Sequence, residues 1–331
     1  MANLRVGLIG CGGMMRHHLW QFYENVKIGG VDIVALCDVS DDSLNETTRR
    51  YPQLAGVPQF KTHQAMLDSA ELDAVVIASP HAPHREHAEA AFAKGLHVLV
   101  EKPLSCTVAD CRALISARDA SGKVGAVSYQ RHGMAVYKYM KEVVSSGRYG
   151  KLLMLNSSLS QDWLRNTSGS WRQSLAISGG GQINDSGSHM IDVLLWILGV
   201  QGHTVSAFMD NRGSEVDINS VVNIVFDGGT LGSLTIIGDA PIWQERHSFW
   251  FEEACLFIDD EKFKIVERSG VTSTLEIKGQ DQNPLVNFFG AIRGENEVNA
   301  PFECGLQTIA LTEAAWRSRE QGGVPIQVQK V

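Results

Sequence analysis

Short apolar runs alternate with longer amphipathic stretches through the first 128 residues of the chain. The apolar runs are typical of buried strands, and the stretches between them carry apolar residues at helical spacing. We expect strands at residues 4–9, 32–37, 74–78, 97–100 and 123–127. We expect helices up to Val26, at 43–51, 64–69 and 84–94, and from Thr107 onward. Because strands and helices that alternate in this way form right-handed βαβ units, residues 1–128 are predicted to be an α/β domain with a doubly wound parallel sheet.

The pattern changes at about residue 129 and becomes mostly β after residue 204. Helices are expected at 136–146, 186–198 and 306–319, and a strand at 151–160. Between residues 204 and 275 the chain is β-rich, and the turn Asp227-Gly228-Gly229 between two β-branched runs predicts a hairpin. We therefore expect residues 129–331 to form an α+β domain. Its large, mostly antiparallel sheet should have one face covered by helices and the other face open.

Composition narrows the class of protein. A chain of 331 residues is too long for a typical single core and fits two domains. Its 29 basic and 37 acidic side chains give a net charge of −8 without a Lys/Arg run, so neither nucleic acid nor a membrane surface is an expected partner. The longest apolar stretches are too short to span a bilayer, and no leader peptide is visible. Six cysteines without a CxxC pair predict reduced thiols in a cytoplasmic protein and no metal site.

A glycine-rich turn, Gly10-Cys11-Gly12-Gly13-Met14-Met15, joins the first strand to the first helix. Glycines there let backbone N–H groups approach a pyrophosphate at the positive end of the helix. Met15 stands where this motif usually has Gly or Ala, which puts close packing of helix on strand in question. Asp38 ends the second strand, where a carboxylate can accept hydrogen bonds from ribose hydroxyls. An ordinary glycine turn with an ordinary strand-end Asp is the alternative to a Rossmann dinucleotide site.

The cofactor preference follows from the residues around Asp38. This carboxylate would repel a 2′-phosphate, and the next residues, Val39-Ser40-Asp41-Asp42, provide no Lys or Arg to hold one. NAD is therefore expected as the cofactor, and NADP is disfavoured.

Polar residues follow two further strands at their carboxyl ends. These are Ser79-Pro80 and, on the next strand, Glu101-Lys102-Pro103-Leu104. Ligands of open α/β sheets bind at this edge, so Ser79, Pro80 and Glu101 are expected to flank the cofactor and Lys102 to serve both cofactor and substrate. His84 is either another cofactor contact or an anchor for the start of its helix.

A second glycine-rich motif, Gly179-Gly180-Gly181, precedes the helix expected at 186–198. Asp185 and His189 are four residues apart and should share a helix face, with Asp192 one turn further on. Such a carboxylate and imidazole could be a structural pair or half of a metal site, but nearby residues supply no third ligand. A packing or capping role is expected for Asp192.

Two motifs together resemble the glucose-fructose oxidoreductase/inositol dehydrogenase/MocA (Gfo/Idh/MocA) family: Glu-Lys-Pro at 101–103 and Gly-Gly-Gly-x-x-x-Asp-x-Gly-x-His at 179–189. The resemblance implies an NAD(P)-dependent oxidoreductase whose His189 accepts the proton of a substrate hydroxyl. An imidazole suits this role because its unperturbed pKa is about 6.5. Lys102 would stabilise alkoxide character on the same oxygen, and Asp185 would orient and charge-balance the pair.

The resemblance also implies contacts from less regular segments. Gln130, after the last strand of the first domain, would touch the nicotinamide side of the cofactor, and Arg131 or His132 the substrate. Trp163 and Trp171-Arg172 precede the triple glycine and offer aromatic faces and a guanidinium. These groups suit a polyhydroxylated or anionic ligand, although the tryptophans are equally compatible with packing.

We therefore expect an NAD-dependent dehydrogenase acting on a secondary hydroxyl of a sugar, inositol or related polyol. Three other functions stay open: an NAD-dependent glycosidase that uses transient oxidation, a keto-sugar or enone reductase using NADPH, and a non-catalytic NAD-binding regulator. Lys102, Asp185 and His189 together argue against the regulator, because a sensor needs no base opposite a cation. The resemblance further implies a homodimer or homotetramer joined through the open sheet face, which would otherwise be an exposed apolar liability.

Overall fold

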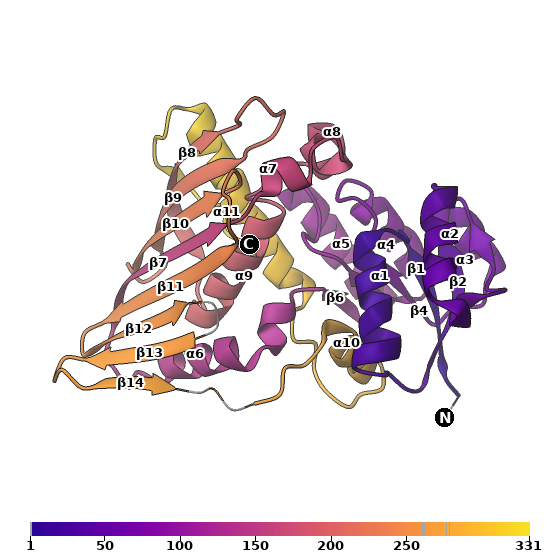
Figure 1. The fold of residues 1–331 in the computed structure, drawn as a ribbon, viewed down its shortest axis with the longest axis horizontal. Helices are drawn as coiled ribbons and strands as arrows, with labels where there is room; N and C mark the ends of the chain where they lie inside the picture. The colour runs from indigo at the N-terminus through magenta and orange to yellow at the C-terminus, as the bar shows by residue number, and fades with distance from the viewer. Residues whose placement is uncertain (1, 260–261, 276, 278) are drawn as a thin grey trace. The chain divides into compact units, whose positions relative to one another are not determined.

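The computed structural model describes residues 2–259, 262–275, 277 and 279–331, and the chain divides into two compact units (Figure 1). The first unit consists of Met1–Gln130 and Gln282–Gly305, and the second of Arg131–Asp281 and Leu306–Val331. The sequence pattern places the boundary two residues earlier, between 128 and 129. It also assigns residues 282–305 to the second domain, whereas they belong to the first unit.

The first unit contains a six-stranded parallel sheet in the order β3-β2-β1-β4-β5-β6. Its strands are β1 Leu4–Ile9, β2 Val31–Cys37, β3 Gln59–Phe60, β4 Ala74–Ile77, β5 His97–Val100 and β6 Gly125–Val127. The strand order reverses between β1 and β4, at the switch point where doubly wound sheets bind dinucleotides. The predicted Rossmann sheet is confirmed, with the two-residue edge strand β3 as an addition.

Helices connect these strands close to the predicted positions: α1 Gly13–Trp20, α2 Asp41–Arg50, α3 His63–Ser69, α4 His84–Ala93 and α5 Val108–Ser121, with a 3₁₀ turn at Pro52–Leu54. α1 ends before Val26, because the chain continues as a π-helical turn over Gln21–Asn25. α5 opens as expected: the Thr107 hydroxyl accepts a hydrogen bond from the Asp110 N–H at 3.1 Å. This bond satisfies one of the unpaired donors at the helix start.

Residues 282–305 complete the core of the first unit. α10 (Pro284–Ile292) places Phe288 and Phe289 in the same buried cluster as Leu8 and Leu99. The Val127 N–H of β6 donates to the Ala300 carbonyl at 2.9 Å, so the returning segment also bonds to the edge of the sheet. Burying one such phenylalanine ring stabilises a fold by roughly 1.5–3 kcal/mol, which explains why this apolar segment returns.

The second unit contains a nine-stranded sheet in the order β14-β13-β12-β11-β7-β10-β9-β8-β15. Its strands are β7 Leu152–Ser160, β8 Gly202–Asp210, β9 Asn219–Phe226, β10 Leu231–Ile237, β11 Gln244–Phe251, β12 Ala254–Asp259, β13 Lys262–Glu267, β14 Thr272–Leu275 and β15 Ile326–Gln327. β7 and β10 pair in parallel, and the other neighbours are antiparallel. Gly228 and Gly229, at φ 88° and 87°, form the predicted β9–β10 turn. Asp260 and Glu261 of the predicted β-rich stretch lie outside the described residues.

The helices of the second unit are α6 Ala135–Ser146, α7 Trp163–Asn166, α8 Leu175–Ser178, α9 Ser186–Leu198 and α11 Phe302–Glu320. The first residues of α11 belong to the first unit. Short 3₁₀ turns lie at Gln130–Gly133 and Trp171–Gln173. α6, α9 and α11 cover one face of the sheet (Figure 1). The other face carries exposed large side chains, among them Met154, Phe208, Val221, Leu231 and Trp250. The predicted mostly antiparallel sheet with one open face is therefore confirmed. α7 and α8 occur where the sequence predicts an irregular loop.

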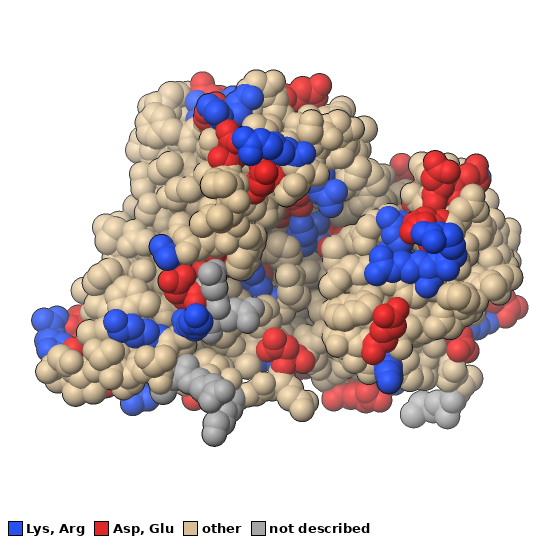
Figure 2. All heavy atoms as spheres, viewed as in Figure 1, with Lys and Arg blue, Asp and Glu red and all other residues tan. Residues whose placement is uncertain are grey.

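The surface in view mixes charges of both signs. Figure 2 shows Lys and Arg in small groups next to Asp and Glu, between wide areas without charged side chains. Among the described residues, no helix combines the length and apolar character needed to cross a membrane.

Candidate functional site

The glycine turn between β1 and α1 has two kinds of glycine. Gly10 has φ 84°, and a Cβ there would lie 2.4 Å from the Ser79 backbone nitrogen, so it lets the turn contact the end of β4. A Cβ at Gly12 or Gly13 would meet no described atom within 4 Å. Packing within the unit therefore does not demand these two glycines, whereas close approach of a pyrophosphate to the helix start does.

Met15 lies in the core and does not obstruct the turn. Its side chain is fully buried in the cluster that contains Val6 and Leu36, so α1 packs on the sheet through methionine where other chains use a smaller residue. Any contribution of Met15 to a cofactor site would come from its backbone.

Asp38 follows β2 and braces the glycine turn. Its Oδ2 accepts a hydrogen bond from the Cys11 N–H at 2.7 Å, and its Oδ1 accepts one from the Ser40 N–H at 2.8 Å. Burial, followed by the charge of Asp38, raises the pKa of the Cys11 thiol to about 12, so this cysteine stays a neutral packing group. The Asp38 side chain is half-buried and keeps lone pairs for ribose hydroxyls. The turn, α1 and Asp38 thus fit a nicotinamide adenine dinucleotide.

His84 supports the edge of the sheet from inside. It is fully buried, with Nδ1 2.9 Å from the Pro103 carbonyl oxygen and Nε2 3.0 Å from the Ser79 carbonyl oxygen. Both ring nitrogens lie against backbone carbonyls, which favours the second of the two predicted roles of His84, an anchor at the start of its helix. Ser79 has a second partner, since its Oγ lies 3.0 Å from Nδ1 of His87. Burial and the neighbouring His63 lower the pKa of His87 to about 3, so the neutral ring can accept from the Ser79 hydroxyl.

Glu101 and Lys102 follow β5, with a cis peptide bond between Lys102 and Pro103. Glu101 is buried, and its Oε1 lies 2.6 Å from Nε2 of His18 on α1. Burial alone would raise the pKa of Glu101, but His18 and the charge of Lys102 hold it below its ordinary value. Lys102 is half-buried beside this carboxylate. Glu101 therefore links α1 to the lysine loop and is ionised at neutral pH.

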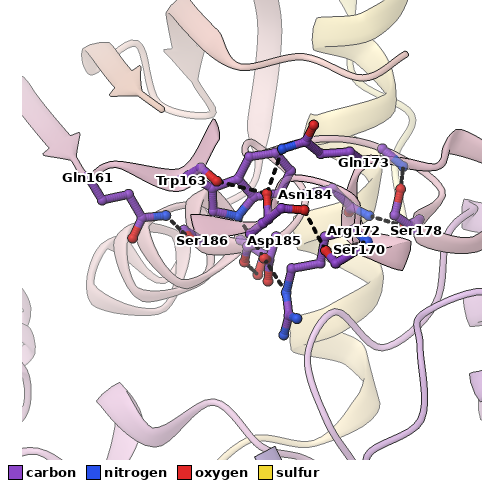
Figure 3. A network of polar contacts seen from close by, with 12 residues as sticks. Gln161, Trp163, Ser170, Arg172, Gln173, Ser178, Asn184, Asp185 and Ser186 are labelled. Carbon is purple, nitrogen blue, oxygen red and sulfur yellow. Dashed lines mark hydrogen bonds and ion pairs between the residues drawn. The ribbon is translucent and has the colours of Figure 1, made fainter. Parts of the chain in front are cut away.

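Three of the predicted residues of the second unit meet at Asp185. Its Oδ2 accepts hydrogen bonds from Trp163 Nε1 at 2.9 Å and from Arg172 Nε at 3.1 Å (Figure 3). Asp185 directly precedes α9 and is buried, whereas Arg172 is about one-third exposed. The Arg172 guanidinium also lies over the Trp171 ring, 4.5 Å from its centroid. Trp163 and Arg172 therefore hold the carboxylate that precedes the helix, and Trp171 contacts the guanidinium of Arg172.

His189 lies one turn into α9 and is half-buried, whereas Asp192 faces the interior. Asp192 Oδ2 is 2.8 Å from Nε2 of His132, whose ring stacks on Trp196 with centroids 4.4 Å apart. These contacts agree with a packing role for Asp192, and they also occupy His132, one of the two candidates for a substrate contact.

Arg131 forms a buried ion pair with Glu245 of β11. Glu245 Oε1 is also 2.7 Å from His247 Nε2 and accepts a hydrogen bond from the Tyr137 hydroxyl at 3.2 Å. Burial alone would raise the pKa of Glu245, but Arg131 and His247 lower it to about 2. The guanidinium is thus held inside the unit, and the neighbouring Gln130 is exposed.

Sequence reasoning missed the partners that hold these residues. They are His18 for Glu101, His87 for Ser79, Glu245 for Arg131 and Asp217 for the triple glycine. No local signal points to Asp217, because Glu215 and Asn219 flank its apolar neighbours Val216 and Ile218, as in an ordinary polar loop.

Two family models match adjacent stretches of the chain. One describes an oxidoreductase family with an NAD-binding Rossmann fold and matches residues 4–129, and the other describes the GFO/IDH/MocA C-terminal domain and matches residues 137–256.

Curated relatives are dehydrogenases at low identity. The chain is 26% identical over 254 residues to 1-carboxy-3-chloro-3,4-dihydroxycyclohexa-1,5-diene dehydrogenase of Comamonas testosteroni, covering 76% of this chain and 62% of the relative. It is 30% identical over 211 residues to inositol 2-dehydrogenase 2 of Saccharopolyspora erythraea, covering 63% and 58%. The matches thus span about three fifths of the length of these relatives. The WlbA dehydrogenase from Bordetella pertussis, solved with NADH and UDP-GlcNAcA, shares the fold at TM-score 0.85 and 22% identity, covering 99% of this chain and 100% of that one.

Proposed function

Because the chain belongs to the Gfo/Idh/MocA oxidoreductase family, we propose that it is an NAD-dependent dehydrogenase acting on a secondary hydroxyl of a sugar, inositol or related polyol. The observation that carries this proposal is the placement of Asp185. Trp163 and Arg172 fix its carboxylate at the start of the helix that holds His189, in a chain whose other unit is an NAD-binding Rossmann fold. The names of the two curated relatives, which indicate inositol and a dihydroxylated ring as substrates of those proteins, support the substrate class.

In the proposed reaction each residue has one task. NAD, when bound, accepts the hydride. His189 takes the hydroxyl proton in its neutral form, and Lys102 stabilises the negative charge that develops on the substrate oxygen. Asp185 orients and charge-balances them, and Arg172 holds that carboxylate in place. Arg172, which is about one-third exposed, is proposed to line the substrate side, and Gln130 the nicotinamide side. Arg131, paired with Glu245, and Trp163, bonded to Asp185, are proposed to support the substrate side from inside the unit.

NAD is proposed over NADP because of the chain that follows β2. Asp38 offers its carboxylate where a 2′-phosphate would stand, and Val39, at 86% exposure, offers no cation. The six free cysteines support a cytoplasmic location.

The test is a kinetic comparison of Lys102→Ala and His189→Ala with wild type on a polyol found by screening sugars and inositols with NAD and NADP. Lys102→Ala should lower kcat by roughly a hundredfold or more while NAD binding, followed by fluorescence, is retained. His189→Ala should lower kcat by about 10²–10⁴ and remove the acidic limb of the pH profile, since only the neutral imidazole accepts a proton. If the His189 variant keeps its rate and its acidic limb, the base lies elsewhere.

Screening also separates the other functions. Cleavage of a glycoside without net NADH release would indicate the glycosidase, and faster turnover of a ketone with NADPH would indicate the reductase.

We also propose that the open sheet face joins two copies of the chain. From β8 to β11, one cross-strand row on that face is polar: Ser206, Asn223, Ser233, Asn156 and Ser248. The adjacent row carries the exposed Leu231, Met154 and Trp250. Apolar area next to a row of hydroxyl and amide side chains suits a symmetric interface. Wild type should sediment as a dimer or tetramer and Leu231→Lys/Trp250→Lys as a smaller species; a monomeric wild type would contradict the proposal.

A further inference from the structure

The triple-glycine turn before α9 is enclosed by residues that the proposed reaction does not use. A Cβ at Gly180 would lie 2.2 Å from Cζ2 of Trp316 on α11. A Cβ at Gly181 would lie 1.9 Å from the backbone oxygen of Asp217, in the connection between β8 and β9. Both approaches are closer than any side chain permits, so these glycines are required by packing.

Asp217 supplies most of the polar contacts of this turn. Its Oδ1 accepts hydrogen bonds from the Gly181 N–H at 3.0 Å and from Trp316 Nε1 at 3.1 Å, and its Oδ2 accepts one from the Ile183 N–H at 2.9 Å. Its backbone carbonyl accepts from the Gln182 N–H at 2.9 Å. The side chain is buried, and within the described part of the chain no Lys, Arg or His forms an ion pair with it. A buried carboxylate that is balanced only by N–H donors holds those donors tightly, because the alternative is an unpaired charge.

This triple-glycine turn also holds the start of α9. The Gly181 carbonyl accepts hydrogen bonds from the N–H groups of Asn184 at 3.1 Å and Asp185 at 3.0 Å. The Gln182 carbonyl accepts from the Gly187 N–H at 2.8 Å. Two of the peptide groups that donate hydrogen bonds to Asp217 thus also accept hydrogen bonds from the start of α9. Through these two groups, Asp217 holds the backbone of Asp185 and the first turn of the helix.

We propose that Asp217, together with Trp316, is a positioning residue for the reaction: it fixes the 179–185 turn and thereby sets where the Asp185 carboxylate and the His189 imidazole lie. This inference rests on the proposed function, in which those two groups act on the substrate. Asp217 itself touches neither reactant. A displacement of a catalytic group by about 1 Å can lower the rate roughly a hundredfold. The hydrogen bonds of Asp217 are therefore required for the reaction rate as well as for packing.

The experiment compares Asp217→Asn and Trp316→Phe with the matched control Ser318→Ala. Asparagine keeps the shape of Asp217 but turns one acceptor into a donor facing an N–H group. Phenylalanine keeps an aromatic ring at 316 and removes only the Nε1–H. Ser318 is also buried on α11 and loses two hydrogen bonds as alanine, to the Ala207 N–H and the Val324 carbonyl, neither of which belongs to the turn.

Asp217→Asn should lower kcat by roughly 10- to 100-fold and Trp316→Phe by a smaller factor in the same direction. NAD affinity, measured by fluorescence, should stay within about twofold, because the residues proposed to hold the dinucleotide lie in the other unit. Ser318→Ala should lower the melting temperature and leave kcat of the folded enzyme unchanged. If both turn variants lower the melting temperature while kcat per folded molecule stays at the wild-type value, Asp217 has only a structural role.

A second readout does not depend on turnover. The NMR titration of the His189 ring, assigned by comparison with His189→Ala, should shift in Trp316→Phe and Asp217→Asn and not in Ser318→Ala. An unchanged His189 titration in both turn variants would overturn the positioning role. An altered titration in a protein that oxidises no polyol would leave the positioning role standing and reject the proposed function instead.

Discussion

Each unit has a glycine turn bonded to an aspartate, and the two turns use glycine for different reasons. Asp38 accepts from the Cys11 N–H in the first, and Asp217 accepts from the Gly181 and Ile183 N–H groups in the second. Around Gly12 there is room for a Cβ, whereas at Gly181 a Cβ would collide with the backbone of Asp217. Asp38 is half-buried and accepts one hydrogen bond on each carboxylate oxygen, while the Asp217 carboxylate is buried and accepts three.

The comparison separates two roles that a glycine turn bonded to an aspartate can have. A glycine turn with free space around it and a half-exposed carboxylate can contact a ligand. A tightly packed glycine turn with a buried carboxylate instead holds neighbouring segments of the chain together. Substitutions at matched positions can therefore distinguish a binding turn from a supporting turn.

The largest expected contrast is between Gly181→Ala and Gly12→Ala. The first should destabilise the fold by roughly 4 kcal/mol or more, or prevent folding, because backbone must move to admit the methyl group. The second should change the free energy of unfolding by less than about 1 kcal/mol, since Gly12 has an ordinary φ of −76°. It should instead weaken NAD binding by about tenfold or more, the scale of one lost hydrogen bond to a charged group. Urea unfolding and NAD titration measure both effects; equal stability losses would remove the contrast.

The pH dependence of stability should differ between two buried carboxylates of the second unit. Burial raises the pKa of Asp217 despite its N–H donors, so its contribution is greatest at low pH and is lost as pH rises through the folded-state pKa. Glu245 is also buried, but Arg131 and His247 hold its pKa at about 2. Its contribution, roughly 3 kcal/mol, is present above its ordinary pKa and is lost as pH falls from about 4.5 toward 2.

Urea unfolding of Glu245→Gln and Asp217→Asn from about pH 7 to about pH 3 tests this expectation. The gap between wild type and Glu245→Gln should narrow as pH falls, and the gap for Asp217→Asn should widen. Gaps that change in the same direction would show that the ion pair with Arg131 does not distinguish the two carboxylates.

A smaller effect is expected at the glycine turn of the first unit. Asp38→Ser combined with Val39→Arg removes the carboxylate and adds a cation at an exposed position. The ratio of kcat/KM for NADP to that for NAD should rise by about 10- to 100-fold, the scale of one or two charge-assisted hydrogen bonds. Val39→Arg alone serves as the control, because it keeps the repelling carboxylate. A wild type that already prefers NADP would contradict the role given to Asp38.

Local sequence patterns were sufficient to predict most of the longer helices and strands and some of the candidate site residues. β1, β5 and α9 have the predicted bounds, because each is a mainly apolar segment with clear ends. The short edge strands β3 and β15 carry too few residues for a periodic signal. α10 was missed because its relation to the first unit depends on contacts with residues far away in the chain.

The candidate site divides in the same way. Asp38 could be placed from the spacing of a βαβ unit, and Asp185 and His189 from the motif that opens α9. The hydrogen bonds that hold them could not be predicted, because Trp163, although a candidate residue, reaches Asp185 across 22 residues, and Asp217 reaches Gly181 across 36. Such contacts are set by tertiary packing, which a local reading of one sequence does not contain.

The return of residues 282–305 to the first unit has a consequence for how the protein is made. Phe288 and Phe289, which complete the core around Leu8, are translated only after nearly all of the second unit. During synthesis an N-terminal domain usually folds first and alone. Here the core of the first unit is complete only once residues 282–305 have left the ribosome, so the apolar side chains that pack on Phe288 and Phe289 stay uncovered until then.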